Sequence, residues 1–296
     1  MGHWADFIRT SFAEGDAERD RGLGTPDNII RHDNILYGTD ETWQVLDVYR
    51  RKEDEGKKIP VIVSVHGGGW VYGDKEGYQF YCMDLAQHGF ASVNFSYRLA
   101  PEAPHPASLE DTNLVFTWVM EHAQEYGFDT DHIFAAGDSA GAHIIAMYLD
   151  VLTNPEYAAK YDFKAPEGLK ITAVALDCGE YKVVFDDPAI NDMMQGLMAE
   201  YLPGGGTDEE LELVSPVNYV TEEFPPVFLM SASQDFLKAQ APIMAAKLTQ
   251  CSVPFTYKFY GSAEHPLAHV FHLDIRSEDA IACRNEQCAF FRGFVA

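Results

Sequence analysis

Residues Gly137–Gly141 read Gly-Asp-Ser-Ala-Gly and carry the strongest fold signal in this 296-residue chain. An apolar run, His132–Ala136, precedes the pentapeptide, and a helical pattern, Ala142–Leu149, follows it. A strand, a sharp turn and a helix in this order are typical of a nucleophile elbow, in which flanking glycines let neighbouring backbone pass closely. Ser139 is therefore a candidate nucleophile. Because Gly and Ser are common, the pentapeptide alone is also compatible with an ordinary turn.

A second glycine-rich stretch offers the backbone donors that an activated serine needs. Pro60–Val65 predicts a buried strand, which runs directly into His66–Trp70, reading His-Gly-Gly-Gly-Trp. Because glycines have no side chain, their backbone amides can converge on the negative oxygen that forms when an ester carbonyl becomes tetrahedral. The amide of Ala140, directly after the serine, completes this predicted oxyanion hole. A simple turn or a phosphate loop is the alternative, but no Gly-Lys-Ser/Thr or Gly-x-Gly-x-x-Gly accompanies this stretch.

The acid of a catalytic triad is expected at a strand end downstream of the elbow. Pro226–Ala232 is another buried-strand pattern, and Asp235 follows at its C-terminal end. Open parallel sheets bind ligands at these ends. Asp235 is therefore the candidate acid.

The base is expected in a polar loop that follows one further predicted strand, Phe255–Tyr260. This loop contains His265, His269 and His272. A serine, an aspartate and a histidine in this chain order are typical of the α/β-hydrolase fold and differ from the chymotrypsin and subtilisin orders.

Several motifs spread over most of the chain occur together. They are His66–Trp70, Tyr97–Glu102 with Pro106-Ala107 and Glu110-Asp111, Gly137–Gly141, Asp235–Leu237 and His269–Phe271. Jointly they resemble the hormone-sensitive-lipase-like branch of the α/β-hydrolase esterases.

The resemblance implies a role for each matching residue. It implies that Ser139 is the nucleophile, that Asp235 orients the base, and that His269 of the His-x-Phe turn is the base. It also implies that Gly68 and Gly69 carry oxyanion donors, beside Ala140. His265 and His272 remain competitors for the base, and Asp138 on the elbow is interpreted as a structural hydrogen-bond acceptor.

The cap over the cleft departs from the family pattern, because only about thirty residues precede the first predicted strand. Cap elements are expected in residues 1–28 and 178–220. The second segment carries Met193, Met194, Leu197, Met198 and Tyr201 at helical spacing. We expect this helix and the stretch Trp4–Glu18 to shape an acyl pocket, since methionines adapt to their ligands. The alternative is that these side chains only pack the cap onto the core.

The expected substrate-binding residues are Trp70, Tyr97, Met194 and Met198. Aromatic residues beside a sheet end belong to the core about as often as to a pocket. Arg98 and Glu102 belong to a turn that the resemblance places next to the oxyanion loop, and an internal structural role is predicted for both.

The rest of the chain alternates strand and helix patterns, which predicts an α/β fold with a largely parallel sheet covered on both faces. One α/β-hydrolase domain over residues 1–296 is expected. Beyond those named above, the predicted strands are Ile29–Tyr37, Trp43–Arg50, Ala91–Tyr97 and Ile171–Leu176. The first two of these are expected to pair antiparallel at the start of the sheet. The predicted helices are Tyr78–His88, Ala107–Tyr126 and Ser277–Phe294.

The net charge and the positions of the cysteines and histidines argue against several classes of partner and cofactor. A net charge of −25 opposes binding to nucleic acid or to anionic membranes. Five cysteines without framework spacing indicate reduced thiols. The pairs His265/His269 and Cys283/Cys288 lack metal-site context, so neither a metal nor another cofactor is expected. No signal peptide or membrane span is expected, which favours a cytoplasmic protein, and a homodimer is compatible with the sequence.

The motifs predict a serine hydrolase that works through an acyl-enzyme, and the resemblance implies a carboxylesterase that hydrolyses short-chain acyl esters of small molecules. An amidase or formamidase is the alternative within the same chemistry, because the same triad hydrolyses amides. A non-catalytic ligand-binding protein of the same fold is the alternative outside enzymes.

Overall fold

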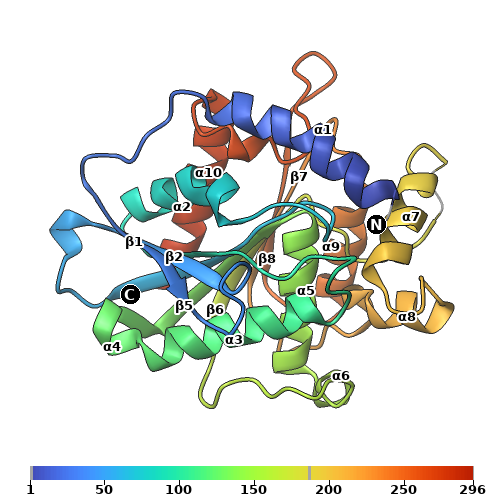
Figure 1. The fold of residues 1–296 in the computed structure, drawn as a ribbon, viewed down its shortest axis with the longest axis horizontal. Coiled ribbons are helices and arrows are strands. Elements are labelled where there is room, and N and C mark those ends of the chain that lie inside the picture. Colours follow the sequence, from blue (N-terminus) through green and yellow to red (C-terminus); the bar gives the residue numbers. More distant parts are fainter. Residues whose placement is uncertain (1–2, 186–187, 296) are drawn as a thin grey trace.

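The computed structural model describes residues 3–185 and 188–295 and is built around an eight-stranded sheet (Figure 1). The strands are β1 (Ile29–Leu36), β2 (Val45–Arg51), β3 (Ile59–Val65), β4 (Ala91–Phe95), β5 (Phe128–Asp138), β6 (Ile171–Asp177), β7 (Val227–Ala232) and β8 (Phe255–Tyr260). Their spatial order is β1-β2-β4-β3-β5-β6-β7-β8, with β1, β2 and β4 paired antiparallel and all other neighbours parallel. The predicted α/β architecture with an antiparallel start is confirmed.

Helices cover both faces of this sheet (Figure 1). They are α1 (His3–Asp20), α2 (Lys75–Gln87), α3 (Ala107–Glu121), α4 (Ala123–Tyr126), α5 (Ala140–Thr153), α6 (Pro155–Ala158), α7 (Asn191–Tyr201), α8 (Asp208–Leu213), α9 (Gln240–Gln250) and α10 (Glu278–Arg292). In the part of the chain that the structure describes, short 3-10 turns span Lys52–Asp54, Pro216–Asn218 and Phe271–Leu273.

Buried strands alternate their side chains between two apolar clusters. On β3, Val61 and Val63 join the cluster formed with α3, α5 and α9, whereas Ile62 joins the cluster formed with α2 and α10. A parallel strand covered on both faces favours apolar side chains on both, which explains the apolar run of β3, interrupted only by the buried Ser64. The five cysteines are free thiols, as predicted.

Side-chain caps move several element boundaries from their predicted positions. The second strand begins at Val45 rather than Trp43, because the Asp40 carboxylate accepts from the amides of Thr42 and Trp43 and holds a turn there. Helix α2 begins three residues before Tyr78, since Asp74 caps it by accepting from the amide of Gly77.

The helix predicted over residues 107–126 is divided into α3 and α4. The interruption falls at His122, whose ring Nδ1 lies 2.9 Å from the carbonyl oxygen of Trp118. The backbone amide of His122 donates to the same carbonyl oxygen, also at 2.9 Å, so the ring contact adds to the helical hydrogen bond there and does not replace it. Gly127 ends α4 in the left-handed conformation, with φ 65°, as its sequence position predicts.

Helices α1 and α7 lie side by side beyond the C-terminal ends of the central strands (Figure 1). The Glu200 carboxylate of α7 accepts from the amides of Trp4 and Ala5, both at 2.9 Å, and so caps the first turn of α1. The Trp4 ring occupies the space that a side chain at Gly196 would need. The expected cap segments 1–28 and 178–220 also include residues 1–2 and 186–187, which lie outside the described residues.

We expect Glu200→Ala to loosen α1. Unsatisfied amides in the first turn of a helix cost about 1–2 kcal/mol, which corresponds to roughly 5- to 30-fold faster opening. Hydrogen exchange of the α1 amides, followed by mass spectrometry, measures this directly. Glu200→Gln keeps an acceptor oxygen and should lose less protection. Exchange of α1 at the wild-type rate in Glu200→Ala would show that another contact holds the helix.

No helix in the described part of the chain combines the length and the apolar character needed to cross a membrane.

Candidate active site

Ser139 lies in the sharp turn between β5 and α5, in the strand–turn–helix context that the sequence predicts. Its backbone has φ 52° and ψ −120°, a strained conformation for a residue with a Cβ. A Cβ on Gly141 would lie 2.0 Å from the carbonyl oxygen of Val65, and one on Gly137 would lie 2.7 Å from the carbonyl carbon of Gly141. Only glycine fits at both positions, so the turn depends on them.

Asp235 follows β7 and is buried, and both oxygens of its carboxylate are hydrogen-bonded. Oδ1 lies 2.6 Å from Nδ1 of His269 and accepts from the amide of Leu237 at 2.8 Å, while Oδ2 accepts from the hydroxyl of Ser231 at 2.8 Å. Burial would raise the pKa of Asp235, but the bonds from His269, Leu237 and Ser231 outweigh it and hold that pKa below its usual value. The carboxylate therefore stays ionised beside the imidazole.

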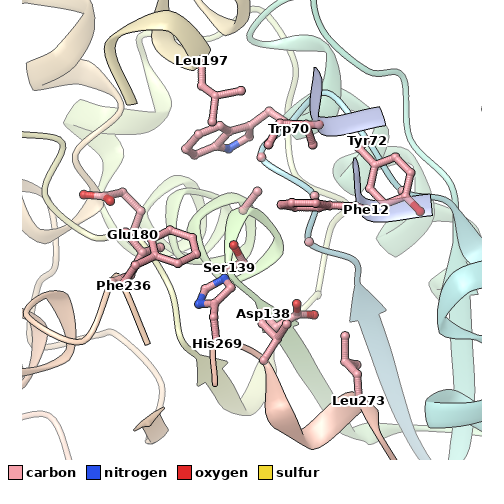
Figure 2. A pocket seen from close by; sticks show the side chains of 18 of the residues that line it. Phe12, Trp70, Tyr72, Asp138, Ser139, Glu180, Leu197, Phe236, His269 and Leu273 are labelled. Atoms are coloured by element: carbon pink, nitrogen blue, oxygen red, sulfur yellow. The ribbon is translucent and has the colours of Figure 1, made fainter. Parts of the chain in front are cut away.

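Of the three candidate histidines, the structure brings His269 to the serine. The His269 ring lies beside the Ser139 side chain in one cavity (Figure 2). Since Nδ1 is engaged by Asp235, Nε2 is the nitrogen left for the serine hydroxyl. His265 is exposed and pairs with Asp279 at 2.8 Å. His272 is buried, with Nε2 3.8 Å from a carboxylate oxygen of Asp177.

The loop after β3 turns its glycines towards the same cavity. Gly68 and Gly69 have φ of 114° and 60°, and a Cβ on Gly68 would lie 2.0 Å from the carbonyl oxygen of Tyr72. Within the described residues, the amides of Gly68 and Gly69 donate to no protein acceptor. Both line the cavity together with Ser139 and Ala140. Free amides next to a serine are suited to a developing negative charge.

Asp138 supports this loop through a neighbour that sequence reasoning missed. Its Oδ2 accepts from the hydroxyl of Tyr78 at 2.8 Å, and the same hydroxyl accepts from the amide of Gly67 at 2.9 Å. Burial raises the pKa of Asp138 to about 7, although the Tyr78 hydrogen bond acts to lower it. The prediction that Asp138 is a structural acceptor is confirmed. No local signal marks Tyr78, because it lies sixty residues before Asp138 in the chain.

The cavity in front of Ser139 has a volume of about 110 Å³, and its upper walls are apolar (Figure 2). Side chains from α1, the oxyanion loop, α7 and the loop after Asp235 form these walls: Ile8, Phe12, Trp70, Tyr72, Met193, Met194, Leu197, Phe236 and Leu237. Polar side chains, including Asp16, Arg19, Tyr78 and Asp138, occupy another part of the lining.

Two of the four expected substrate-binding residues line this cavity and two do not. Trp70 and Met194 are in the lining. Tyr97 is fully buried behind the oxyanion loop, where its hydroxyl donates to the carbonyl oxygen of His66 and its ring stacks on the His66 ring at 4.0 Å. Met198 lies one turn beyond Met194 on α7, beside Gly206, and is fully buried. For these two residues the core interpretation is the correct one.

Phe236 is a lining residue that the sequence analysis did not select. Its ring centroid lies 4.2 Å from that of His269, and the side chain is partly exposed at the cavity mouth. The sequence feature that could have identified Phe236 as a lining residue is its position directly after the candidate acid Asp235.

The turn containing Arg98 and Glu102 has the structural role predicted for it, with one unexpected partner. Arg98 donates to the buried carboxylate of Asp111. Glu102 forms a two-armed ion pair with Arg9 of α1, at 2.7 and 2.8 Å. Arg9 also donates to the carbonyl oxygens of Val71 and Ala100. Glu102 therefore helps to fix α1 over the oxyanion loop.

One group in the described residues has the donor atoms of a metal site: Cys178, Asp235 and His269, with ligand atoms within 4.8 Å of one another. Burial raises the pKa of the Cys178 thiol well above its usual value, and a protonated thiol is a poor metal ligand. Nδ1 of His269 is already bonded to Asp235. We therefore interpret the group as an acid–base pair with a neutral neighbour.

Comparison with solved structures places this architecture in the α/β-hydrolase class. Esterase B from Lactobacillus rhamnosis, solved with an inhibitor, superimposes with a TM-score of 0.90 at 22% identity, covering 99% of this chain and 96% of that one. At this level of identity the likeness shows the fold.

Sequence comparison shows the family. The family model described as BD-FAE matches residues 46–248. Versiconal hemiacetal acetate esterase of Dothistroma septosporum is 28% identical over 236 residues, 74% of this chain and 69% of that protein. Esterase LipC of Mycobacterium tuberculosis is 29% identical over 215 residues, 70% of this chain, and the match spans about half of LipC, 51%. The chain belongs to the BD-FAE family, among the hormone-sensitive-lipase-like carboxylic ester hydrolases, which confirms the resemblance inferred from its motifs.

Proposed function

We propose that the protein is a serine carboxylesterase that hydrolyses short-chain acyl esters. Ser139 is the nucleophile, His269 the general base, Asp235 the residue that orients it, and the amides of Gly68, Gly69 and Ala140 form the oxyanion hole. The observation that carries the proposal is the 2.6 Å contact between Asp235 and His269, made by the histidine whose ring lies beside Ser139 in the cavity.

In the acylation step, Nε2 of His269 takes the proton of the Ser139 hydroxyl while the serine oxygen attacks the ester carbonyl carbon. The negative charge that forms on the carbonyl oxygen is held by the backbone amides. The buried Asp235 carboxylate stabilises the imidazolium. His269 then gives its proton to the departing alcohol, which leaves the acyl group on Ser139.

In the deacylation step a water molecule takes the place of the alcohol. His269 removes a proton from the water as its oxygen attacks the acyl carbon, and the same amides hold the second oxyanion. Return of the proton to the serine oxygen releases the carboxylic acid.

The preference for short acyl groups is supported by what closes the cavity. We propose that α1 and α7 are the cap. Leu197 of α7 lies against the oxyanion loop, with Cδ1 3.4 Å from the point that a Cβ on Gly69 would occupy. Ile8 and Phe12 of α1 line the same cavity. Bulky side chains this close to the reacting carbonyl leave little room for a long acyl chain.

A chain-length series of 4-nitrophenyl esters, from acetate to decanoate, tests this proposal. Turnover that depends on Ser139 and is fastest with acetate or butyrate is the expected result. A maximum at decanoate would refute the short-chain preference. A folded protein that hydrolyses none of the esters would refute the esterase and direct attention to anilides or to simple binding.

Met194→Ala is expected to shift the acyl preference towards longer chains. Met194 lines the cavity, so truncation opens space there. Because one methylene in an apolar pocket changes kcat/KM by about tenfold or more, the octanoate-to-acetate ratio of kcat/KM should rise at least about tenfold.

Met198→Ala is the matched control, since Met198 lies on the same helix but outside the cavity. It should lower the free energy of unfolding by about 2–4 kcal/mol and leave the acyl ratio unchanged. If both variants lose stability and neither changes the ratio, the methionines serve only as packing.

A further inference from the structure

His143 occupies a position on the nucleophile helix from which it can act on the oxyanion loop. It lies on α5, one turn after Ser139, and its amide donates to the carbonyl oxygen of Ser139 at 3.1 Å. The imidazole is fully buried and does not line the cavity, so it has no direct access to substrate.

Both ring nitrogens of His143 are bonded, and the partners determine which nitrogen carries the proton. Nε1 of Trp70 lies 3.1 Å from Nδ1, and the carbonyl oxygen of Val214 lies 2.6 Å from Nε2. An indole N–H only donates and a carbonyl only accepts, so Nδ1 is the bare acceptor and Nε2 carries the hydrogen. The imidazole is thereby fixed in one neutral tautomer. Burial also lowers the pKa of His143 to about 4, which keeps it neutral near pH 7.

Trp70 belongs to the loop that presents the oxyanion amides, and its backbone is strained. It has φ 63° and follows Gly68 and Gly69, which also have positive φ. A non-glycine residue in this region persists only where its surroundings hold it. The indole is held by the hydrogen bond to His143 and by stacking on Tyr201 of α7, with ring centroids 5.0 Å apart and planes at 20°.

We propose that His143 is a positioning residue: through its bond to the Trp70 indole it fixes the Gly68 and Gly69 amides relative to Ser139. The Nε2 of the same ring is bonded to the carbonyl of Val214, directly after α8, so the imidazole joins the nucleophile helix, the oxyanion loop and the end of α8. This inference rests on the proposed esterase function, because it concerns the placement of that reaction's oxyanion donors.

The test compares two substitutions of His143 that differ only in hydrogen bonding. His143→Gln supplies an amide oxygen to accept from Trp70 and an amide N–H to donate to Val214. His143→Leu fills similar space and supplies neither. A misplacement of about 1 Å at the reacting groups slows catalysis about 100-fold, so His143→Leu should lower kcat about 10- to 100-fold. Its KM for 4-nitrophenyl acetate should stay within about threefold, since oxyanion bonds are formed in the transition state.

His143→Gln should recover kcat to within about fivefold of wild type. Thermal unfolding of each variant, measured alongside, separates a kinetic effect from loss of folded protein. If His143→Leu retains wild-type kcat, or if a folded His143→Gln is as slow as His143→Leu, the positioning role is refuted.

Trp70→Phe removes the indole donor of the same hydrogen bond, and it provides the test if His143→Leu does not fold. It should lower kcat with little change in KM, and the double variant His143→Gln/Trp70→Phe should be no better than Trp70→Phe alone. An unchanged kcat in Trp70→Phe would refute the proposal. Failure of the proposed function has a different signature: wild-type turnover would be absent, or would survive Ser139→Ala, whatever residue 143 is.

Discussion

Ser139→Ala is expected to lower kcat for 4-nitrophenyl acetate by about 10⁴- to 10⁶-fold, as removal of the nucleophile does in other serine hydrolases. The substitution deletes one oxygen and keeps the Cβ, so the backbone conformation at φ 52° is no more strained than before. The amide of residue 139 still donates to the carbonyl oxygen of Asp177, at 2.9 Å in the wild type. The variant should therefore fold normally.

Two measurements make this prediction specific. The unfolding midpoint should match that of wild type, which shows that activity was lost through chemistry. A 4-nitrophenyl phosphonate should add one phosphonyl group to wild type at Ser139, detected by peptide mass, and none to the variant. Turnover that survives in Ser139→Ala, or a label found on another residue, would remove Ser139 from the mechanism.

Asp235→Asn should have the second largest effect, a loss of about 10³- to 10⁴-fold in kcat. The Leu237 amide and His269 both approach Oδ1, and Ser231 donates to Oδ2. An asparagine oxygen can still face Leu237, but the charge that stabilises the imidazolium is gone from a buried site. Where the asparagine NH₂ faces His269 instead, it forces the proton onto Nε2, and His269 cannot act as base.

Ser231→Ala is the matched control for this charge, because it removes a hydrogen bond to the same carboxylate without touching His269. It should slow kcat by about tenfold or less. We expect kcat to decrease from wild type to Ser231→Ala and to be lowest in Asp235→Asn. Equal effects of the two substitutions would mean that carboxylate orientation, and not its charge, is the main contribution of Asp235.

The sequence predicts those parts of the site whose requirements are local. Gly137 and Gly141 are needed because backbone passes within 2.0–2.7 Å of where their Cβ atoms would lie, and such a need leaves a fixed pattern around Ser139. Asp235 is recognisable because it follows a buried strand. His269 could be chosen over His265 and His272 only through the family resemblance, since all three occupy one polar loop.

The contacts that hold these parts together could not be predicted, because they join residues far apart in the chain. Glu200 caps α1 at Trp4, from which it is separated by 196 positions in the sequence, and Trp70 bonds to His143, which lies 73 positions further along the chain. For the same reason Met198 was assigned to the pocket along with Met194. Helical spacing places both on neighbouring turns, and only the packing of α7 against the body of the protein shows that one is enclosed and the other faces the cavity.

Part of the cavity wall is supplied by elements other than those that carry the groups proposed to react. Reacting groups follow the C-terminal ends of sheet strands, whereas Ile8, Phe12, Met193 and Leu197 come from two helices that lie over them. Substrate choice can therefore diverge by drift in two short surface segments while the catalytic apparatus stays constant. For directed evolution, a combinatorial library confined to these four helical positions would sample new ester specificities at little risk to turnover itself.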